Sequence, residues 1–494
     1  MLSKIPQVYL GVAILVVVVG FYIFVNLPTS DPDSPRTLRR GILNVHDFGI
    51  PATRFVGVEM LRSPRTPELI TEIEKLIEQN GLPTDIFRGL SVDMSIEEWQ
   101  RLQFNNIAVT LHYFFGEYYE ADPDNPGVPR NNNLEILWEA SPLVGVSGID
   151  ARTLDRVRGT LAEFEPRRQS IRNELRNPLT IFFFIIPPDS LVPRTDIFRG
   201  AIVNAGASKY LADYALLEEY AIAQALIDGN IQEAMYALDN IFRIAYLASM
   251  LEDVGTRIDV AHVRLRAFDV MERVVLDPAF ERQHMMILLE RLLLREHQSW
   301  IPEYVIWFGD RANGLMMYQR LSIAWLNNTL EPGILREFER YLFNREIPMD
   351  VAARSFRIHQ EADMIFYLQA MQRIIDASRQ PVARRDAVLD EIDREIHARQ
   401  NRFDDDGNTL EPFVAGFRLH HVEDFMVLFA QDQSALHRAI VAALHSLGQQ
   451  NTDQYRDPFT DEPYAVEIDD EGFLSVSAMR LPRPFRVPVF GTSN

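Results

Sequence analysis

A long apolar segment near the amino terminus constrains this chain more than any other feature. Residues Val8 to Leu27 read VYLGVAILVVVVGFYIFVNL and include no charged residue. Because a helix rises about 1.5 Å per residue, about 20 apolar residues suffice to cross the hydrocarbon core of a membrane. A secretory signal peptide has a shorter apolar core, of about 7–15 residues, and ends at a cleavage site between small residues. This segment ends instead at Asn26, Pro28 and Asp31, so we expect an uncleaved transmembrane helix in contact with the lipid bilayer.

The charged residues on either side of this segment bear on its orientation. Lys4 precedes it, whereas Arg36, Arg39 and Arg40 follow it, and basic residues prefer the cytoplasmic side. Only seven residues precede the segment, and a large carboxyl-terminal part can cross a membrane regardless of its charge. We therefore expect a single-pass protein of the inner (cell) membrane, with a cytoplasmic tip and a soluble region on the non-cytoplasmic side.

The composition excludes several classes of function. The 494 residues carry 70 Asp and Glu against 49 Lys and Arg, and the net charge of −21 repels the phosphates of nucleic acids. The absence of cysteine excludes disulfides, thiolate metal sites and a cysteine nucleophile. The sequence has no GxxxxGK[ST], HExxH or GxSxG motif. We therefore expect no nucleic-acid partner and none of the common NTPase, zinc-protease or serine-hydrolase sites.

Changes in composition and periodicity divide the chain into five expected segments. A helix is expected near Ile96–Tyr119, and a loop rich in Pro, Asp and Asn begins at Ala121. The segments are a cytoplasmic tip and transmembrane anchor (1–27), a linker (28–40), a mixed, mostly helical N-terminal region (41–200), an α-helical region (201–450) and a β-hairpin tail (451–494).

The helical region shows its periodicity most clearly between Ile231 and Tyr246. Apolar residues recur there at intervals of three and four, which places them on one face of a helix. The turn Asp228-Gly229-Asn230 precedes this helix and allows the previous helix to pack against it in an antiparallel hairpin. The hairpin resembles one tetratricopeptide unit, but no second copy follows at the period of about 34 residues that such arrays need. We therefore predict a mainly α fold, with irregular, hairpin-stacked helices after the anchor.

A repeated pattern supplies the one candidate metal site. Phe-Arg-x-His-x-x-x-Asp occurs twice, and places His359 with Asp363 and His420 with Asp424 one helical turn apart. If the two helices faced each other, two imidazoles and two carboxylates could bind a divalent metal. In the alternative interpretation each aspartate accepts a hydrogen bond from its own histidine, and the repeat reflects two similarly packed helices. The second interpretation is the expected one, so we expect no cofactor.

The tail resembles a known segment. Residues from Asp457 read DPFTDEPY, and the alternation of Tyr464, Val466 and Ile468 before the polar turn at Asp469–Gly472 predicts a β-hairpin. This segment is similar to the C-terminal DPxxGxPY segment of pseudopilins, with Asp461 in place of the glycine. It is more similar to the end of uncharacterised bacterial membrane-anchored helical proteins, which also carry one N-terminal anchor and a helical stretch like the one that begins at Ala221. The resemblance implies an architecture and a location, and no activity.

These observations predict a non-enzymatic cell-envelope scaffold or protein-interaction subunit. Its expected partners are the lipid bilayer, through Val8 to Leu27, and another protein. The alternative is a metal-dependent, hydrolytic enzyme in which a metal held by His359, Asp363, His420 and Asp424 activates water.

Overall fold

The computed structural model describes rather more than half of the chain. The described residues are 106–115, 121–122, 125–129, 133–141, 149–177, 180, 182, 197–249, 254–297, 302–308, 310–311, 314, 363, 366–400, 419, 422–449 and 451–490. The expected anchor at Val8–Leu27 lies outside these residues and stays a prediction. Within them, no helix combines the length and the apolar character that crossing a membrane requires.

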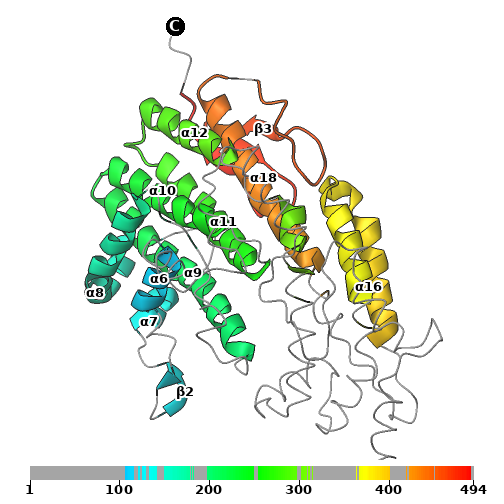
Figure 1. The fold of residues 1–494 in the computed structure, drawn as a ribbon. Coiled ribbons are helices and arrows are strands. Elements are labelled where there is room, and N and C mark those ends of the chain that lie inside the picture. The colour runs from blue at the N-terminus through cyan, green and yellow to red at the C-terminus, as the bar shows by residue number, and fades with distance from the viewer. Residues whose placement is uncertain are drawn as a thin grey trace, which may run out of the picture. The chain divides into compact units, whose positions relative to one another are not determined.

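The predicted mainly α fold is confirmed for the described residues (Figure 1). Helical stretches also cover 303–308 and 366–378. The named helices are α6 (Ile107–Phe115), α7 (Asn133–Ala140), α8 (Ala151–Leu175), α9 (Ile197–Ile227), α10 (Ile231–Ala248), α11 (Val254–Val275), α12 (Arg282–His297), the 3-10 turn η3 (Val382–Arg384), α16 (Asp386–Gln400) and α18 (Val422–Ser446).

The chain divides into two compact units. One comprises Met1–Leu61, Leu315–Gln369 and Ile396–Phe417, of which few residues are described. The other comprises Arg62–Gly314, Ala370–Glu395 and Arg418–Asn494 and contains all the packing described below. The segment boundaries expected at residues 27, 40, 200 and 450 stay predictions.

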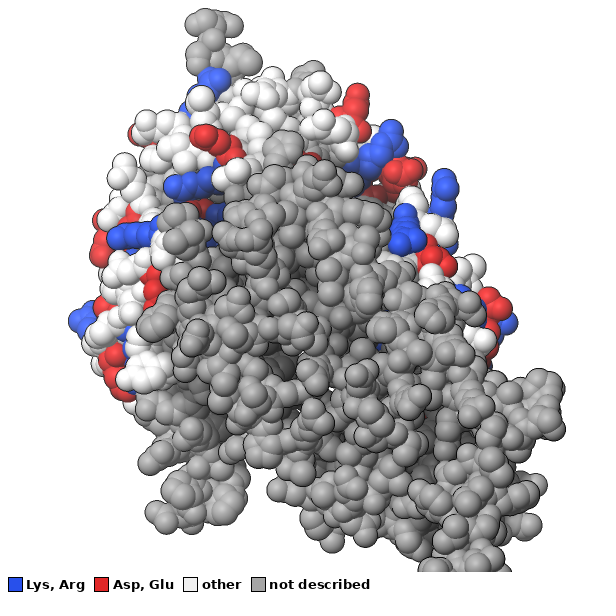
Figure 2. Space-filling view, in the orientation of Figure 1, with Lys and Arg blue, Asp and Glu red and all other residues white. Residues whose placement is uncertain are grey.

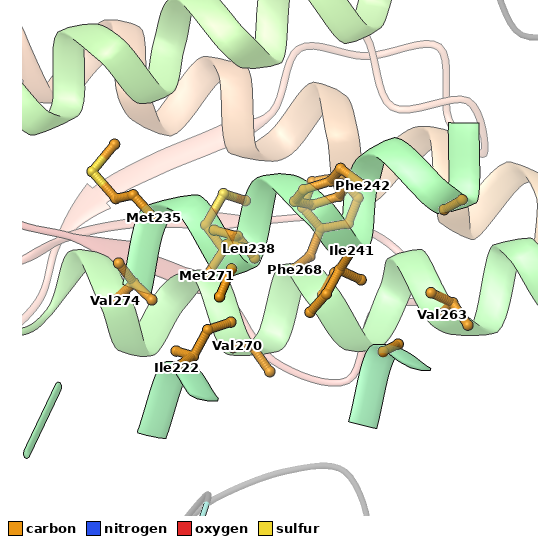
Figure 3. Close-up of a cluster of buried hydrophobic side chains, with 14 of the residues drawn as sticks. Ile222, Met235, Leu238, Ile241, Phe242, Val263, Phe268, Val270, Met271 and Val274 are labelled. Carbon is orange, nitrogen blue, oxygen red and sulfur yellow. The ribbon is translucent and has the colours of Figure 1, made fainter. Parts of the chain in front are cut away.

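Helices α9, α10 and α11 form the centre of the larger unit, and α18 packs against α11. The sequence Asp228-Gly229-Asn230 makes the turn into α10, with Gly229 at a positive φ of 67° that favours glycine. The side chain of Asn230 accepts a hydrogen bond from the N–H of Glu233 at 3.1 Å and caps α10. The helix expected over Ile231–Tyr246 is thereby confirmed. Figure 3 shows its apolar face meeting α11, through Met235, Leu238, Ile241 and Phe242 on α10 and Val263, Phe268, Met271 and Val274 on α11.

The loop expected from Ala121 contains regular structure that the sequence did not predict. Two short antiparallel strands, β1 (Ala121–Asp122) and β2 (Asn125–Pro129), pair within it. The sequence did not reveal them because β1 spans only two residues and β2 contains two prolines, which strands usually exclude. The helix expected near Ile96–Tyr119 is described as α6 within its second half.

The C-terminal tail contains the expected hairpin and a third strand that the sequence did not predict. Strands β3 (Ala465–Ile468) and β4 (Leu474–Ser477) pair antiparallel, with Val466 opposite Val476. Strand β5 (Phe485–Val487) then pairs antiparallel with β4 and completes the sheet order β3-β4-β5. Its Phe485 and Val487 are buried, and both β4 and β5 contact α18. The tail is therefore a small sheet that covers one face of a core helix.

Candidate functional site

A buried ion-pair cluster joins α8 to α9. The carboxylate of Glu218, which is fully buried on α9, accepts hydrogen bonds from Nε and Nη2 of Arg172, the first of them at 2.7 Å. Arg168 donates to the same carboxylate at 3.2 Å, and the hydroxyl of Tyr214 donates to it at 2.6 Å. Arg172 also donates to Glu233, at the start of α10, at 2.6 Å. The cluster thus holds three helices in one register.

The electrostatics of the cluster keep its charges paired. Burial by itself would lower the pKa of the Arg172 guanidinium, but Glu218 and Glu233 outweigh burial and raise it above the ordinary value. Burial, together with the adjacent charge of Glu218, raises the pKa of Tyr214 well above its ordinary value, so Tyr214 stays a hydrogen-bond donor. A carboxylate that is bound by two guanidinium groups and a phenol is better suited to a structural role between helices than to proton transfer.

A groove runs beside this cluster, between α8, α9 and the first turn of α10. Its volume is about 330 Å³. Small side chains leave this space open, since Ala162 on α8 and Ala221 and Ala225 on α9 stand where longer side chains would fill it. Each helix contributes residues at intervals of three and four, so one stripe of each helix lines the groove. The stripes include Leu154, Arg158, Leu161, Ala162, Glu165 and Arg168 on α8, and Leu217, Ala221, Gln224 and Ala225 on α9; Asp228 in the following turn, Asn230 and Glu233 extend the lining to the start of α10.

A second buried cluster joins α11 to α18. Asp432, which is 1% exposed, pairs with Arg264 at 2.7 Å and lies 3.8 Å from the guanidinium of Arg257. Burial lowers the pKa of Arg264 to about 9, although Asp432 acts in the opposite direction. Burial likewise raises the pKa of Asp432 against the effect of both arginines. Because Asp432 and Arg264 are both buried, we interpret this cluster as an internal tie between the two helices.

The residues predicted to bind a metal are described only in part. Asp363 is buried, and Asp424 is exposed in the first turn of α18. His359 and His420 lie outside the described residues. Among the residues that the structure does describe, no three His, Asp or Glu side chains come close enough together to hold a metal ion. The shared metal site therefore stays an untested prediction.

The groove and its ion-pair cluster were not predicted from the sequence, although one signal was present. In α9 the acidic pair Glu218-Glu219 interrupts the apolar run YALLEEYAIAQAL, which is the pattern of a carboxylate inside a core. Its partners, Arg168 and Arg172, are one turn apart on α8. The pairing spans 46 to 50 residues of sequence, so no local pattern could join the two sets.

Comparisons with protein-family models, with curated proteins and with solved structures find no match for this chain.

Proposed function

We propose that this protein is a non-enzymatic scaffold subunit of the cell envelope. It is anchored by Val8–Leu27 and holds a partner protein in the groove between α8, α9 and α10. One observation carries the proposal: the groove has a mostly apolar, small-residue lining at the surface, beside charged groups that are already paired. Apolar grooves rimmed by polar residues are typical of protein-interaction sites.

The pairing of the charges argues against catalysis in the groove. Glu165 accepts hydrogen bonds from Arg168, and Glu233 accepts one from Arg172. A general base must be able to take up a proton near neutral pH, and a neighbouring guanidinium opposes this because it favours the ionised carboxylate. In line with this, the pKa of Glu165 lies below its ordinary value, since hydrogen bonds from Arg168 and Gln169 outweigh the opposing effect of burial.

The turn in the tail is compatible with the resemblance to the pseudopilin segment. Asp461 occupies the position at which the similar pseudopilin segment carries glycine, and its backbone has a φ of 58°. This left-handed conformation favours glycine and is tolerated by aspartate better than by most other residues. The same turn is thus compatible with either residue. The tail adds no reactive group to the groove, so its resemblance supports a shared architecture and not an activity.

The scaffold proposal is tested by filling the groove. Ala162 is exposed and lines the groove, so Ala162→Trp should occupy the space without removing a buried contact. Ala151→Trp places the same side chain at an exposed position of α8 outside the groove and serves as the matched control. We expect quantitative mass spectrometry of the purified full-length chain to show loss of a co-purifying protein with Ala162→Trp alone, at an unchanged melting temperature. Equal co-purification with both variants would contradict the proposal.

A further inference from the structure

The charge around the groove is unevenly distributed. Both arginines of the lining already have carboxylate partners: Arg158 pairs with Asp155 at 2.5 Å, and Arg168 pairs with Glu165 at 2.7 Å and with Glu218. Positive charge at the groove is thus satisfied within the protein. The groove offers no spare cation to an anionic ligand.

Three carboxylates remain accessible at the rim. The side chains of Glu165 and Glu233 are 47% and 37% exposed, although each accepts a hydrogen bond from an arginine. Asp228 is exposed and accepts hydrogen bonds at 2.9 and 3.0 Å from the amide of Gln224, which is neutral and adds no positive charge. The cluster contains two arginines, Arg168 and Arg172, and three glutamates, which are Glu165, Glu218 and Glu233. Its net charge is therefore −1, and Asp228 adds a second negative charge at the rim.

The shape of the groove favours a side chain from a protein over a small molecule. The space of about 330 Å³ lies at the lower end of the range for small-molecule pockets, and exposed residues such as Arg158, Ala162 and Gln224 form part of its wall. A site of this kind leaves most of a small ligand in water. It can still accept a few aliphatic side chains from a partner that covers the rest of the surface.

We infer that the groove binds a cationic amphipathic segment of another protein. Aliphatic side chains of that segment lie on the floor beside Leu161 and Leu217, and a lysine or arginine lies at the rim beside Asp228. This inference rests on the proposed function and adds the chemistry of the partner. The net charge of −21 attracts such a partner over long distances and repels a second copy of this chain.

Peptide binding to the full-length chain in nonionic detergent tests this inference. The probes are three labelled helical peptides: one with leucines spaced by three and four and lysines beside them, one with glutamate in place of each lysine, and one with serine in place of each leucine. Fluorescence anisotropy should show the lysine peptide binding at least about 10-fold more tightly than either of the others. The glutamate peptide lacks the matching charge, and the serine peptide lacks the apolar contact.

Variants of the groove locate the binding. Ala162→Trp should abolish it, and Asp228→Asn should weaken it about 3-fold to 10-fold and reduce its dependence on salt. Glu467→Gln removes an exposed carboxylate from strand β3 and should leave binding unchanged. Binding that survives Ala162→Trp, or that weakens equally with Glu467→Gln, would overturn the inference.

The outcomes separate this inference from the scaffold proposal. If Ala162→Trp removes a partner from the purified chain while the glutamate peptide binds as well as the lysine peptide, the partner is not cationic and only the inference fails. If the partner so removed is another copy of this chain, the inference also fails. If neither the peptides nor the co-purifying proteins respond to Ala162→Trp, both fail.

Discussion

At the scale of single residues, arginine–carboxylate pairs replace apolar contacts at several points inside this helical unit. Removing two charges from water costs several kcal/mol each, so such pairs rarely stabilise a fold more than apolar residues would. They do restrict how helices can pair, because each charge must meet its partner. Glu218 meets its partners Arg168 and Arg172 in this way, and Asp432 meets Arg264. We therefore expect these pairs to specify the packing of α8 on α9 and of α11 on α18.

Substitution of Glu218 tests this role. Glu218→Gln leaves two buried guanidinium groups without their shared carboxylate, and we expect the free energy of unfolding to fall by about 3–5 kcal/mol. Asp155→Asn breaks an ion pair whose side chains are 67% and 79% exposed, and should cost less than about 1 kcal/mol. Urea denaturation followed by circular dichroism measures both. Similar small losses for the two variants would show that the buried cluster does not hold the helices.

We expect His437 to make the stability of the protein dependent on pH. Its ring packs edge-on against Tyr455 at 5.5 Å, and burial lowers its pKa below the ordinary 6.5, although a hydrogen bond with the Arg456 backbone and the charges of Glu296 and Asp457 act in the opposite direction. The unfolded chain takes up a proton near pH 6.5, while folded His437 stays neutral to a lower pH. Its contribution therefore lowers stability as the pH falls below about 6.5.

The variant His437→Gln removes this titration. Its melting temperature should fall less than that of the wild type between about pH 7.5 and about pH 5.5, because the unfolded state no longer gains a proton at this position. Differential scanning calorimetry at the two pH values gives the comparison. An identical fall in both proteins would mean that His437 has the same pKa in the folded and unfolded states.

At the scale of elements, the sequence predicted those parts whose signals are local. The period of apolar residues and the Asp228-Gly229-Asn230 turn were sufficient to place α10, and the alternation around the Asp469–Gly472 turn placed β3 and β4. Strand β5 was missed because it has three residues with Arg486 at its centre, and it exists only through pairing with β4 and burial on α18. The groove was missed because it depends on which stripes of α8 and α9 face each other.

The helix α8 shows why such contacts escape prediction. Pro166 lies inside it, and most of its surface is charged, both of which weaken a helical signal. Its buried residues nevertheless lie on one helical face, because Leu154, Val157, Phe164 and Ile171 follow one another at intervals of three and seven. A buried arginine, Arg168, continues the same face, so a pattern that counts only apolar residues loses part of it.

The packing of the tail on α18 gives the prediction at this scale. Tyr464 is 7% exposed and its hydroxyl lies 3.3 Å from the hydroxyl of Ser434 on α18, whereas Phe473 is only half-buried and packs beneath the guanidinium of Arg486. Tyr464→Ala should lower the free energy of unfolding by about 3 kcal/mol, and Phe473→Ala by about 1 kcal/mol. Chemical denaturation of both variants measures the difference. Equal losses would show that the two rings are buried to the same extent in solution.

At the scale of the whole molecule, an acidic, mainly helical chain carries a predicted membrane anchor. On the face shown in Figure 2, basic and acidic side chains of the described residues are interspersed, and neither sign forms a continuous patch there. A cationic partner would therefore meet local groups of carboxylates and not one continuous acidic surface. The rim of the groove is one such group. An anchored chain would present the groove near the membrane at a high local concentration.

Deletion of residues 1–40 tests the anchor. Because Val8–Leu27 is the one stretch of the sequence that is long and apolar enough to cross a membrane, the shortened chain should move from the membrane fraction to the supernatant after ultracentrifugation. Circular dichroism should show the helical content retained, as a control for folding. A shortened chain that still sediments with membranes would require a second site of membrane contact.

The most direct test of the scaffold account is photocrosslinking from inside the groove in living cells. A photoreactive amino acid replaces Ala162, and a second strain carries it at Ala151 on the same helix. We expect position 162 to give a discrete crosslink to another protein and position 151 to give none, and we expect mass spectrometry to find the crosslinked peptide next to lysine or arginine residues. The absence of a crosslink at Ala162, or the same products from both positions, would contradict the account.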